Sequence, residues 1–385
     1  MENLITIRDL TVRFYTYEGV VHAIEDLDLD IRRGETLGIV GETGSGKTMT
    51  GLAILRLIPY PGKIESGSII FFDAGRGGEL ELLKLREDRM RSIRGNKISM
   101  VFQEPGAALN PVYTIGDQIS EVLLLHRRQE LGRRAKQRVD SLLSDGSGPA
   151  AAAKRPFWRW QRRLYDKIAE QSHPLEPRLL GRIPLFRRLL WRLKDEARLF
   201  TVSMLKDVEI PDPARVASRY PHELSGGMKQ RAVIAMALAC SPNLLIADEP
   251  TTSLDVTIQA QMLELFRRIK VDKGASVLFI THNLGVAAEV CDRVGVMYAG
   301  CVCEVAGVEE MFLHPLHPYT KALLDAVPMP GRPLQTIPGV LADALNPPPG
   351  CRFHPRCPSA MPVCQQEKPK LKEVSKDHMV ACHLY

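Results

Sequence analysis

The stretch "TLGIVGETGSGKT", residues 36–48, decides the fold. It opens as a short apolar strand, and the segment "MTGLAILRLI" that follows it has the composition of a helix. Between them stands the pattern G-x-x-x-x-G-K-T, in the strand, loop and helix order that a phosphate-binding loop requires. The alternative, a plain glycine turn between strand and helix, is disfavoured by this context. The sequence therefore predicts an α/β fold that binds ATP or GTP.

Each residue type in this loop has a physical task. Glycines let the backbone curl so that its N–H groups converge on phosphate oxygens at the amino end of a helix. Lys47 adds a positive charge near the terminal phosphates, and the Thr48 hydroxyl is a ligand for Mg²⁺. The residues expected to contact the nucleotide here are Gly41, Gly44, Ser45, Gly46, Lys47, Thr48 and Thr50.

Two adjacent carboxylates end a second apolar run, in "NLLIADEPTTSLD", residues 243–255. A continuous apolar run of this kind is typical of a parallel strand buried on both faces. At the carboxyl end of such a strand, Asp248 is expected to hold Mg²⁺ and Glu249 to act as the general base toward water. A solvated acidic turn before Pro250 is the alternative, but the strand complements the phosphate-binding loop.

Two further polar residues follow apolar strands, Gln103 in "ISMVFQEP" and His282 in "VLFITHN". Ligands of open α/β sheets bind at the carboxyl ends of the strands, so both side chains could reach the terminal phosphates. Taken singly, each is better explained as an ordinary polar strand end. As a set with the two motifs, they are predicted to act in the nucleotide site.

The segment "PHELSGGMKQR", residues 221–231, places a serine and two glycines before a predicted helix from Met228 to Cys240. Read alone, Ser225 is either a helix cap or part of a binding site. The ordered set "GETGSGKT", "VFQEP", "LSGGMKQR", "LLIADEP", "SLD" and "THN" resembles the nucleotide-binding subunit of ABC transporters, from about Asn3 to Glu310. The resemblance implies an ABC-type P-loop NTPase, with a mixed sheet core and a helical subdomain.

That family pairs two such subunits head to tail. The resemblance implies that Ser225, Gly226 and Gly227 contact the ATP held by the partner subunit, and that Asp255 lies across the same interface. It also implies that Gln103 senses Mg²⁺ and the membrane partner. By the same similarity, His282 holds the γ-phosphate.

An aromatic side chain ahead of the loop is expected to stack on the adenine. The segment "LTVRFYTYEG" offers three. Phe14 resembles the stacking residue of the family best by its position, and Tyr15 and Tyr17 are the alternatives. Each of the three could instead pack against its own strand.

Longer stretches, among them "DEPTTSLDVTIQAQ" and "HPLHPYTKALLDAVP", resemble the ATPase subunits of bacterial oligopeptide and dipeptide importers. This likeness implies four partners: a second ATPase subunit in a heterodimer, two permeases and an extracytoplasmic peptide-binding protein. It also implies a peripheral position on the cytoplasmic face of the inner membrane. The alternatives are an importer of a nickel chelate or antimicrobial peptide, and a soluble non-transport ABC ATPase.

The 385 residues carry a net charge of +6, concentrated in one segment. Lys and Arg outnumber Asp and Glu between residues 150 and 198, whereas the rest of the chain is close to neutral. Because the positive charge is confined to one segment, a general nucleic-acid surface is not indicated. No signal peptide and no apolar run of about 20 residues is present, which predicts a cytoplasmic protein. A basic insertion at about 140–198 interrupts the ATPase domain of 1–310. It holds all three tryptophans, and its second half, with Phe186, Leu190, Leu193, Ala197 and Phe200 on one face, predicts an amphipathic helix.

The tail, residues 311–385, holds four of the eight cysteines, namely Cys351, Cys357, Cys364 and Cys382. Many prolines argue against a helix there, and a cytosolic setting disfavours disulfides. Four thiolates in an irregular loop suit a 4Fe–4S cluster, as in the tails that this segment resembles. Zinc is the alternative, although the spacings lack the tight pairs of zinc ribbons. His354 and His383 are spare candidate ligands. The other cysteines, Cys240, Cys291, Cys301 and Cys303, are expected to be packing residues.

Overall fold

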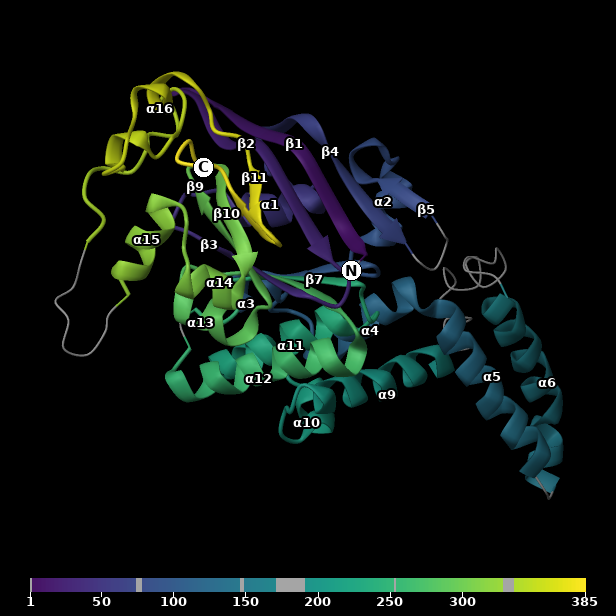
Figure 1. Ribbon diagram of the computed structural model, residues 1–385. Helices are drawn as coiled ribbons and strands as arrows, with labels where there is room; N and C mark the ends of the chain where they lie inside the picture. Colours follow the sequence, from purple (N-terminus) through teal and green to yellow (C-terminus); the bar gives the residue numbers. More distant parts are fainter. Residues whose placement is uncertain (1, 74–77, 146–148, 171–190, 253, 328–335) are drawn as a thin grey trace. The chain divides into compact units, whose positions relative to one another are not determined.

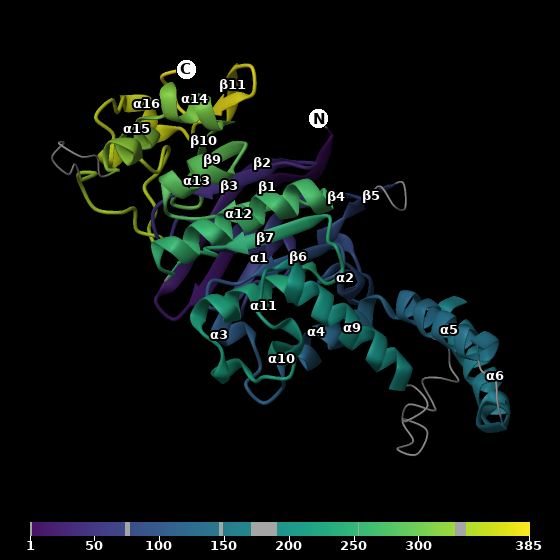
Figure 2. The same cartoon turned by 90° about the horizontal axis from the view of Figure 1, so that it is seen from below.

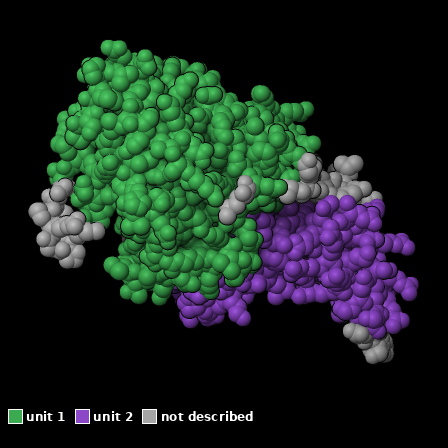
Figure 3. Space-filling view, viewed as in Figure 1, with its two compact units in different colours: residues 1–103, 243–385 green, residues 104–242 purple. Residues whose placement is uncertain are grey.

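The computed structural model describes residues 2–73, 78–145, 149–170, 191–252, 254–327 and 336–385. This part of the chain divides into two compact units. Unit 1 consists of residues 1–103 and 243–385, and unit 2 consists of residues 104–242; they are green and purple in Figure 3. The tail from 311 onward thus belongs to the same unit as the phosphate-binding loop.

Unit 1 is built on a mixed sheet that has eight strands among the described residues, in the order β11-β12-β10-β9-β3-β8-β7-β6 (Figures 1 and 2). The neighbours from β9 to β6 pair in parallel, and the remaining pairs are antiparallel. The parallel strands are β3 (Thr36–Val40), β6 (Ile98–Val101), β7 (Leu244–Asp248), β8 (Ser276–Ile280) and β9 (Arg293–Tyr298). The others are β10 (Cys301–Gly307), β11 (Lys372–Ser375) and β12 (His378–Val380). The strands β3, β7, β8 and β9 are buried along their whole length, which explains their continuous apolar sequences.

A second sheet in unit 1 is antiparallel, with four strands in the described residues in the order β2-β1-β4-β5. The strands are β1 (Asn3–Thr16), β2 (Gly19–Arg32), β4 (Gly62–Asp73) and β5 (Gly78–Glu81). Buried side chains from both sheets form one hydrophobic cluster, which includes Ile7 of β1, Ile39 of β3 and Ile246 of β7. Helix α1 (Lys47–Ile54) contributes Ala53 and Ile54 to it. Helix α1 is therefore anchored to the core at its carboxyl end, and the phosphate-binding loop leads into its amino end.

The remaining helices of unit 1 are short except for one. They are α2 (Glu87–Ile93), α12 (Val256–Lys273), α13 (Leu284–Val290), α14 (Val308–Leu313), α15 (Pro318–Asp325) and α16 (Pro362–Gln366), with 3₁₀ turns at Leu82–Lys84 and His354–Arg356. Helices α12 and α13 each start at a side-chain cap, Asp255 and Asn283, immediately after a loop that follows a parallel strand. These caps fix the loops at the carboxyl ends of β7 and β8.

The secondary-structure elements in the described part of unit 2 are all helical. Its helices are α3 (Pro105–Ala108), α4 (Ile115–His126), α5 (Arg128–Asp145), α6 (Pro149–Glu170), α9 (Trp191–Asp207), α10 (Pro213–Ala217) and α11 (Gly226–Leu238), with a 3₁₀ turn at Pro221–Glu223. Helices α4 and α9 pack together through buried apolar residues and a 3.0 Å hydrogen bond between the Ser120 and Thr201 hydroxyls.

The predicted insertion at about 140–198 corresponds to the end of α5, all of α6 and the start of α9. Helices α5 and α6 approach closely at Gly132, where a Cβ would lie 2.9 Å from a methyl group of Ile168. Ion pairs such as Arg162–Asp140, at 2.6 Å, tie the same two helices. The described part of the insertion is therefore a helical hairpin in unit 2. Two of its tryptophans, Trp160 and Trp191, are exposed.

The amphipathic helix predicted in the second half of the insertion is only partly described. Leu193 and Ala197 are buried in α9, as its apolar face requires. Phe200, on the same helix, is covered by the guanidinium groups of Arg127 and Arg134 at 4.4 and 4.7 Å from its ring centre. The predicted positions Phe186 and Leu190 lie outside the described residues.

The tail joins the larger sheet through a buried carboxylate on β10. Glu304 is fully buried and accepts hydrogen bonds from the backbone N–H groups of Leu316 and His317, at 2.8 and 2.9 Å. Its carboxylate also lies 2.7 Å from Nε2 of His378 on β12. One side chain thus holds both the segment before α15 and the last strand.

His317 makes the attachment of the tail sensitive to pH. Its Nδ1 accepts the N–H of Tyr319 at 3.0 Å and caps α15, and burial lowers its pKa to about 4 from an ordinary value of 6.5. Between about pH 6.5 and pH 4, His317 is therefore protonated in the unfolded chain but stays neutral in the folded chain. The stability contributed by the neutral ring is present above pH 6.5 and is lost as the pH falls toward 4.

We expect the free energy of unfolding to fall by about 2 kcal/mol between pH 7 and pH 5 on account of His317. Urea denaturation at the two pH values measures this difference. The variant His317→Asn keeps a capping oxygen for the Tyr319 N–H but does not titrate, so its stability should depend less on pH by that amount. An identical pH dependence in both proteins would show that His317 is not the titrating group.

Candidate nucleotide site

The phosphate-binding loop has a backbone that only glycine can follow. Gly41, Gly44 and Gly46 have φ values of 155°, 80° and 98°. A Cβ at Gly41 would lie 2.1 Å from the carbonyl oxygen of Met297, and one at Gly46 would lie 2.7 Å from that of Ala23. The loop therefore lies directly against the backbone of Met297 and Ala23 before it enters α1.

Lys47 lies at the start of α1 with its ammonium group inside the loop. Its Nζ donates to the carbonyl oxygens of Gly41 and Glu42 at 2.8 and 2.9 Å, and to the hydroxyl of Ser45 at 3.4 Å. Burial lowers the pKa of Lys47, and the nearby carboxylates of Glu249, Asp248 and Glu42 oppose that shift. A buried cation enclosed by a curled backbone is suited to bind a polyanion.

Asp248 and Thr48 bring two oxygen ligands together at the end of β7. The Thr48 hydroxyl donates to Oδ1 of Asp248 at 3.0 Å, and Asp248 is buried. Burial raises the pKa of Asp248 and the charge of Glu249 adds to the effect, whereas Thr48 and Lys47 oppose it. A carboxylate beside a hydroxyl is the donor type that Mg²⁺ takes together with phosphate oxygens, so the residues present fit the predicted magnesium ion.

Glu249 is held by side chains from three other positions. Its Oε2 accepts hydrogen bonds from Nε2 of Gln103 at 3.1 Å and from the hydroxyl of Thr252 at 3.0 Å. Its Oε1 lies 3.0 Å from Nδ1 of His282. The structure thus brings the predicted residues Gln103, Glu249 and His282 into direct contact at the carboxyl ends of β6, β7 and β8.

The backbone of Glu249 is in the left-handed region, with φ of 44°, and its N–H donates to the carbonyl oxygen of Ile280 at 2.9 Å. This conformation costs free energy for a residue other than glycine, so the surrounding contacts must stabilise it. Strained residues of this kind are common at functional positions. Thr252, three residues further on, was not selected from the sequence. The sequence feature that could have predicted this contact is a hydroxyl residue in the turn directly after Glu249.

A cavity of about 200 Å³ adjoins this cluster and is lined in part by Thr252, His282 and Asn283. The His282 side chain is 55% exposed, whereas that of Glu249 is 15% exposed. Glu249 is therefore mostly shielded, and two of its contact residues, Thr252 and His282, line the cavity.

Ser225 is the N-cap of α11, and its hydroxyl accepts the N–H of Met228 at 3.4 Å. It is exposed at the surface of unit 2, and a Cβ at Gly226 would meet nothing within 4 Å. Asp255 caps α12 in unit 1 by accepting the N–H of Ile258 at 2.9 Å, and it is also exposed. Both residues are structural caps whose outer faces are open.

The three aromatic candidates for adenine stacking differ in their surroundings. Phe14 is half-buried against the core cluster of unit 1. The hydroxyl of Tyr15 donates to Glu65 at 2.9 Å, and the Lys63 ammonium lies 5.3 Å from its ring centre. Tyr17 is fully exposed.

The four tail cysteines lie close enough to influence one another. Burial raises the pKa of Cys351 to about 11, and the thiols of Cys364, Cys382 and Cys357 add to this shift. The N–H of Cys351 also donates to the carbonyl oxygen of Cys364 at 2.8 Å. Nevertheless, the described residues contain no group of three or more His, Cys, Asp or Glu side chains that could hold a metal ion. The side chains as they stand do not form the predicted cluster site.

The cysteines of the ATPase body are packing residues, as expected. Cys240, Cys291 and Cys303 are buried, and Cys301 is half-buried with its thiol 3.6 Å from the carbonyl oxygen of Glu25. Burial raises the pKa of Cys240 to about 11 and that of Cys291 to about 12, so both stay protonated.

In the part of the chain that the structure describes, every helix is too short or too polar to cross a bilayer.

Comparison with known proteins gives two matching families. Residues 24–252 match the family described as ABC transporter, and residues 303–364 match the oligopeptide/dipeptide transporter, C-terminal region. The probable peptide ABC transporter ATP-binding protein y4tR of Sinorhizobium fredii is 42% identical, over 98% of this chain and 94% of that protein. The dipeptide transport ATP-binding protein DppD of Bacillus subtilis is 40% identical, over 100% of this chain and 95% of that protein.

Among solved structures, a dimeric post-hydrolysis state of the ATP-binding cassette MJ0796 bound to ADP and Pi aligns with a TM-score of 0.53. The alignment covers 79% of this chain and 98% of that chain, at 22% identity. At this identity the likeness shows the fold alone, which is that of an ABC ATPase cassette.

Proposed function

Because this chain belongs to the ABC transporter family, we propose that it is the ATP-hydrolysing subunit that powers import of dipeptides or oligopeptides through a membrane transporter. The observation that carries the ATPase function is the contact of Glu249 with Gln103 and His282 beside the Thr48–Asp248 pair. The match of the C-terminal region and the names of the relatives support a peptide as cargo.

In the proposed reaction, the loop N–H groups and the Lys47 ammonium bind the phosphates of ATP. Thr48, Asp248 and Gln103 would hold Mg²⁺, and the bound ion would supply positive charge to the phosphates. Glu249 accepts the proton of the attacking water, and Thr252 orients its carboxylate. His282, whose second ring nitrogen is free of Glu249, contacts the γ-phosphate.

We propose that a second ATPase subunit, packed head to tail, completes each ATP-binding site. Ser225, Gly226 and Gly227 would contact the ATP held by the partner, and Asp255 would lie at the same interface. The exposure of Ser225 and the open space at Gly226 support this role, because a second chain can reach both. Phe14 is proposed to stack on the adenine, with Tyr15 and Tyr17 as the more exposed alternatives.

The proposed partners are a related ATPase, two permeases and an extracytoplasmic peptide-binding protein, with this chain on the cytoplasmic face of the membrane. Purification of the assembled complex through this chain tests the proposal. We expect two permeases and a second ATPase to co-purify from membranes. Recovery of the chain only with nucleic acid or ribosomes would favour the non-transport ATPase, and a nickel-binding partner would favour the metal-chelate importer.

We also propose an ATPase domain at 1–310 and an extension at 311–385 that takes up a 4Fe–4S cluster, with zinc as the alternative metal. Support comes from the mutual influence of the four thiols and from the resemblance of the tail to cluster-binding tails. Since these thiols form no metal-holding group in the structure, cluster uptake requires the loops around them to close and the thiols to lose their protons.

Anaerobic purification should yield a brown protein with about four iron and four sulfide per chain. Cys357→Ser should lose this iron, whereas Cys240→Ser, which alters a buried cysteine outside the tail, should retain it. Metal and sulfide analysis together with the absorption spectrum provides the measurement. A colourless anaerobic preparation with one zinc per chain would replace the cluster by the zinc alternative.

A further inference from the structure

The second residue of the phosphate-binding loop, Glu42, is held by the tail of the chain. Its carboxylate receives both ends of the Arg356 guanidinium, with Nη1 at 2.8 Å from Oε2 and Nη2 at 3.3 Å from Oε1. Its N–H donates to the Tyr319 hydroxyl at 3.1 Å. Its carbonyl oxygen accepts the Lys47 ammonium at 2.9 Å. All the polar groups of Glu42 are thus engaged, two of the three by the tail.

The two tail residues are themselves rigidly placed. The Arg356 side chain is only 4% exposed, and its guanidinium also donates to the carbonyl oxygens of Pro338 and Ile337. The ring of Tyr319 packs at 4.7 Å from that of Tyr298 and at 5.2 Å from that of Phe353. A bidentate arginine held in this way fixes both the position and the orientation of its carboxylate partner.

We propose that Arg356 and Tyr319 are positioning residues of the ATP site, which hold Glu42 and thereby the phosphate-binding loop in its binding conformation. The inference rests on the proposed function of residues 41–48 as the ATP loop. Both residues contact the loop through Glu42, and they are assigned to act through it. The C-terminal extension is then a working part of the nucleotide site and not only an attachment to it.

The expected consequence follows from the cost of ordering a loop. A loop that is already fixed loses little conformational freedom when it binds phosphate, and a released loop must be ordered by the ligand. Removal of Arg356 should therefore weaken ATP binding, while saturating ATP restores the loop. We expect the KM for ATP to rise about tenfold in Arg356→Met, with kcat within about twofold, as outer contacts that orient binding groups have effects of this order in metal sites.

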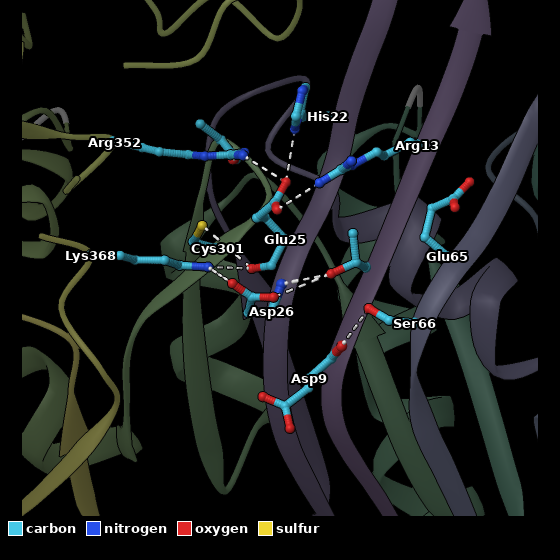
Figure 4. A network of polar contacts seen from close by, with 12 residues as sticks. Asp9, Arg13, His22, Glu25, Asp26, Glu65, Ser66, Cys301, Arg352 and Lys368 are labelled. Atoms are coloured by element: carbon cyan, nitrogen blue, oxygen red, sulfur yellow. Dashed lines mark hydrogen bonds and ion pairs between the residues drawn. The ribbon is translucent and has the colours of Figure 1, made fainter. Parts of the chain in front are cut away.

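A matched control comes from another ion pair, which joins the tail to the antiparallel sheet of unit 1. Lys368 donates to Asp26 and to the carbonyl oxygen of Glu25, both at 2.9 Å, as Figure 4 shows. It lies in the same tail but contacts strand β2 and not the phosphate-binding loop. Lys368→Met should therefore leave the affinity for ATP unchanged.

The experiment measures binding of Mg-ATP by the purified full-length chain, and KM and kcat in the assembled transporter. The variants are Arg356→Met, Arg356→Lys, Glu42→Gln, the double variant Arg356→Met/Glu42→Gln, and Lys368→Met. Arg356→Lys should recover part of the affinity, since lysine supplies the charge without the bidentate geometry. The double variant should bind ATP no more weakly than Arg356→Met, because the two residues act as a pair. Thermal unfolding of each variant shows that it is folded.

Wild-type affinity in both Arg356→Met and Glu42→Gln would overturn the inference while the wild-type chain still binds ATP. Equal weakening by Lys368→Met would also overturn it, because the tail would then act only by general packing. If the losses of ATP affinity in Arg356→Met and Glu42→Gln added up in the double variant, Arg356 would not act through Glu42, and the inference would be contradicted. Failure of the wild-type chain itself to bind ATP would instead contradict the proposed function.

Discussion

Glu249→Gln should bind ATP as the wild type does and hydrolyse it about 10²- to 10⁴-fold more slowly. The glutamine side chain has nearly the same size, so it keeps a hydrogen-bond partner for Thr252 and leaves the phosphate-binding loop unchanged. It cannot accept a proton from water, so only the chemical step is lost. Turnover of the assembled transporter at saturating ATP measures the effect, and equilibrium binding of ATP shows that the site is intact.

The control is Glu264→Gln, the same substitution at an exposed position of α12 whose partner is the surface residue Arg267. It should hydrolyse ATP at the wild-type rate. Comparable turnover in Glu249→Gln and Glu264→Gln would remove Glu249 from the role of general base.

Lys47→Ala and Ser225→Arg should each lower ATP hydrolysis by about 10²-fold, since each removes a group that stabilises charge on the phosphates. They should do so at different sites of a head-to-tail pair. When Lys47→Ala and Ser225→Arg chains are mixed, one site combines both defects and the other site is intact. The mixture should then be more active than either variant alone. If assembly requires a different partner ATPase, the same cross is made between the two different chains.

If Ser225 acted only as the cap of α11, the two defects would stay within their own chains and mixing would restore nothing. Hydrolysis that is insensitive to Ser225→Arg in every pairing would contradict action across the interface.

The parts of the site that the sequence could predict are those set by local order. A buried parallel strand must end at the same sheet edge as its neighbours, so Gln103, Asp248, Glu249 and His282 were expected to meet the loop that follows β3. The structure places Gln103 and His282 in contact with Glu249 for this reason. The left-handed φ of Glu249 has no such local signal, because the residue is not a glycine.

The contacts that escaped prediction join residues far apart in the chain. Glu42 and Arg356 are 314 positions apart, and nothing in the composition of either segment marks them as partners. The attachment of β12 to β10 through Glu304 is similar, since it depends on a buried carboxylate meeting His378. The tail cysteines show the opposite case. Their number predicts a metal site, and the four thiols do influence one another, yet among the described residues they do not form a group that could hold a metal ion.

ATP hydrolysis by this chain is proposed to drive peptide uptake. The direct measurement is the initial rate of uptake of a radiolabelled dipeptide and a radiolabelled oligopeptide by host cells in which the gene for this chain is deleted and then restored. Restoration with the wild-type chain should recover uptake of at least one of the two peptides, whereas restoration with Glu249→Gln should not. Peptide uptake that is unaffected by the deletion, with loss of nickel uptake in the same cells, would contradict the account.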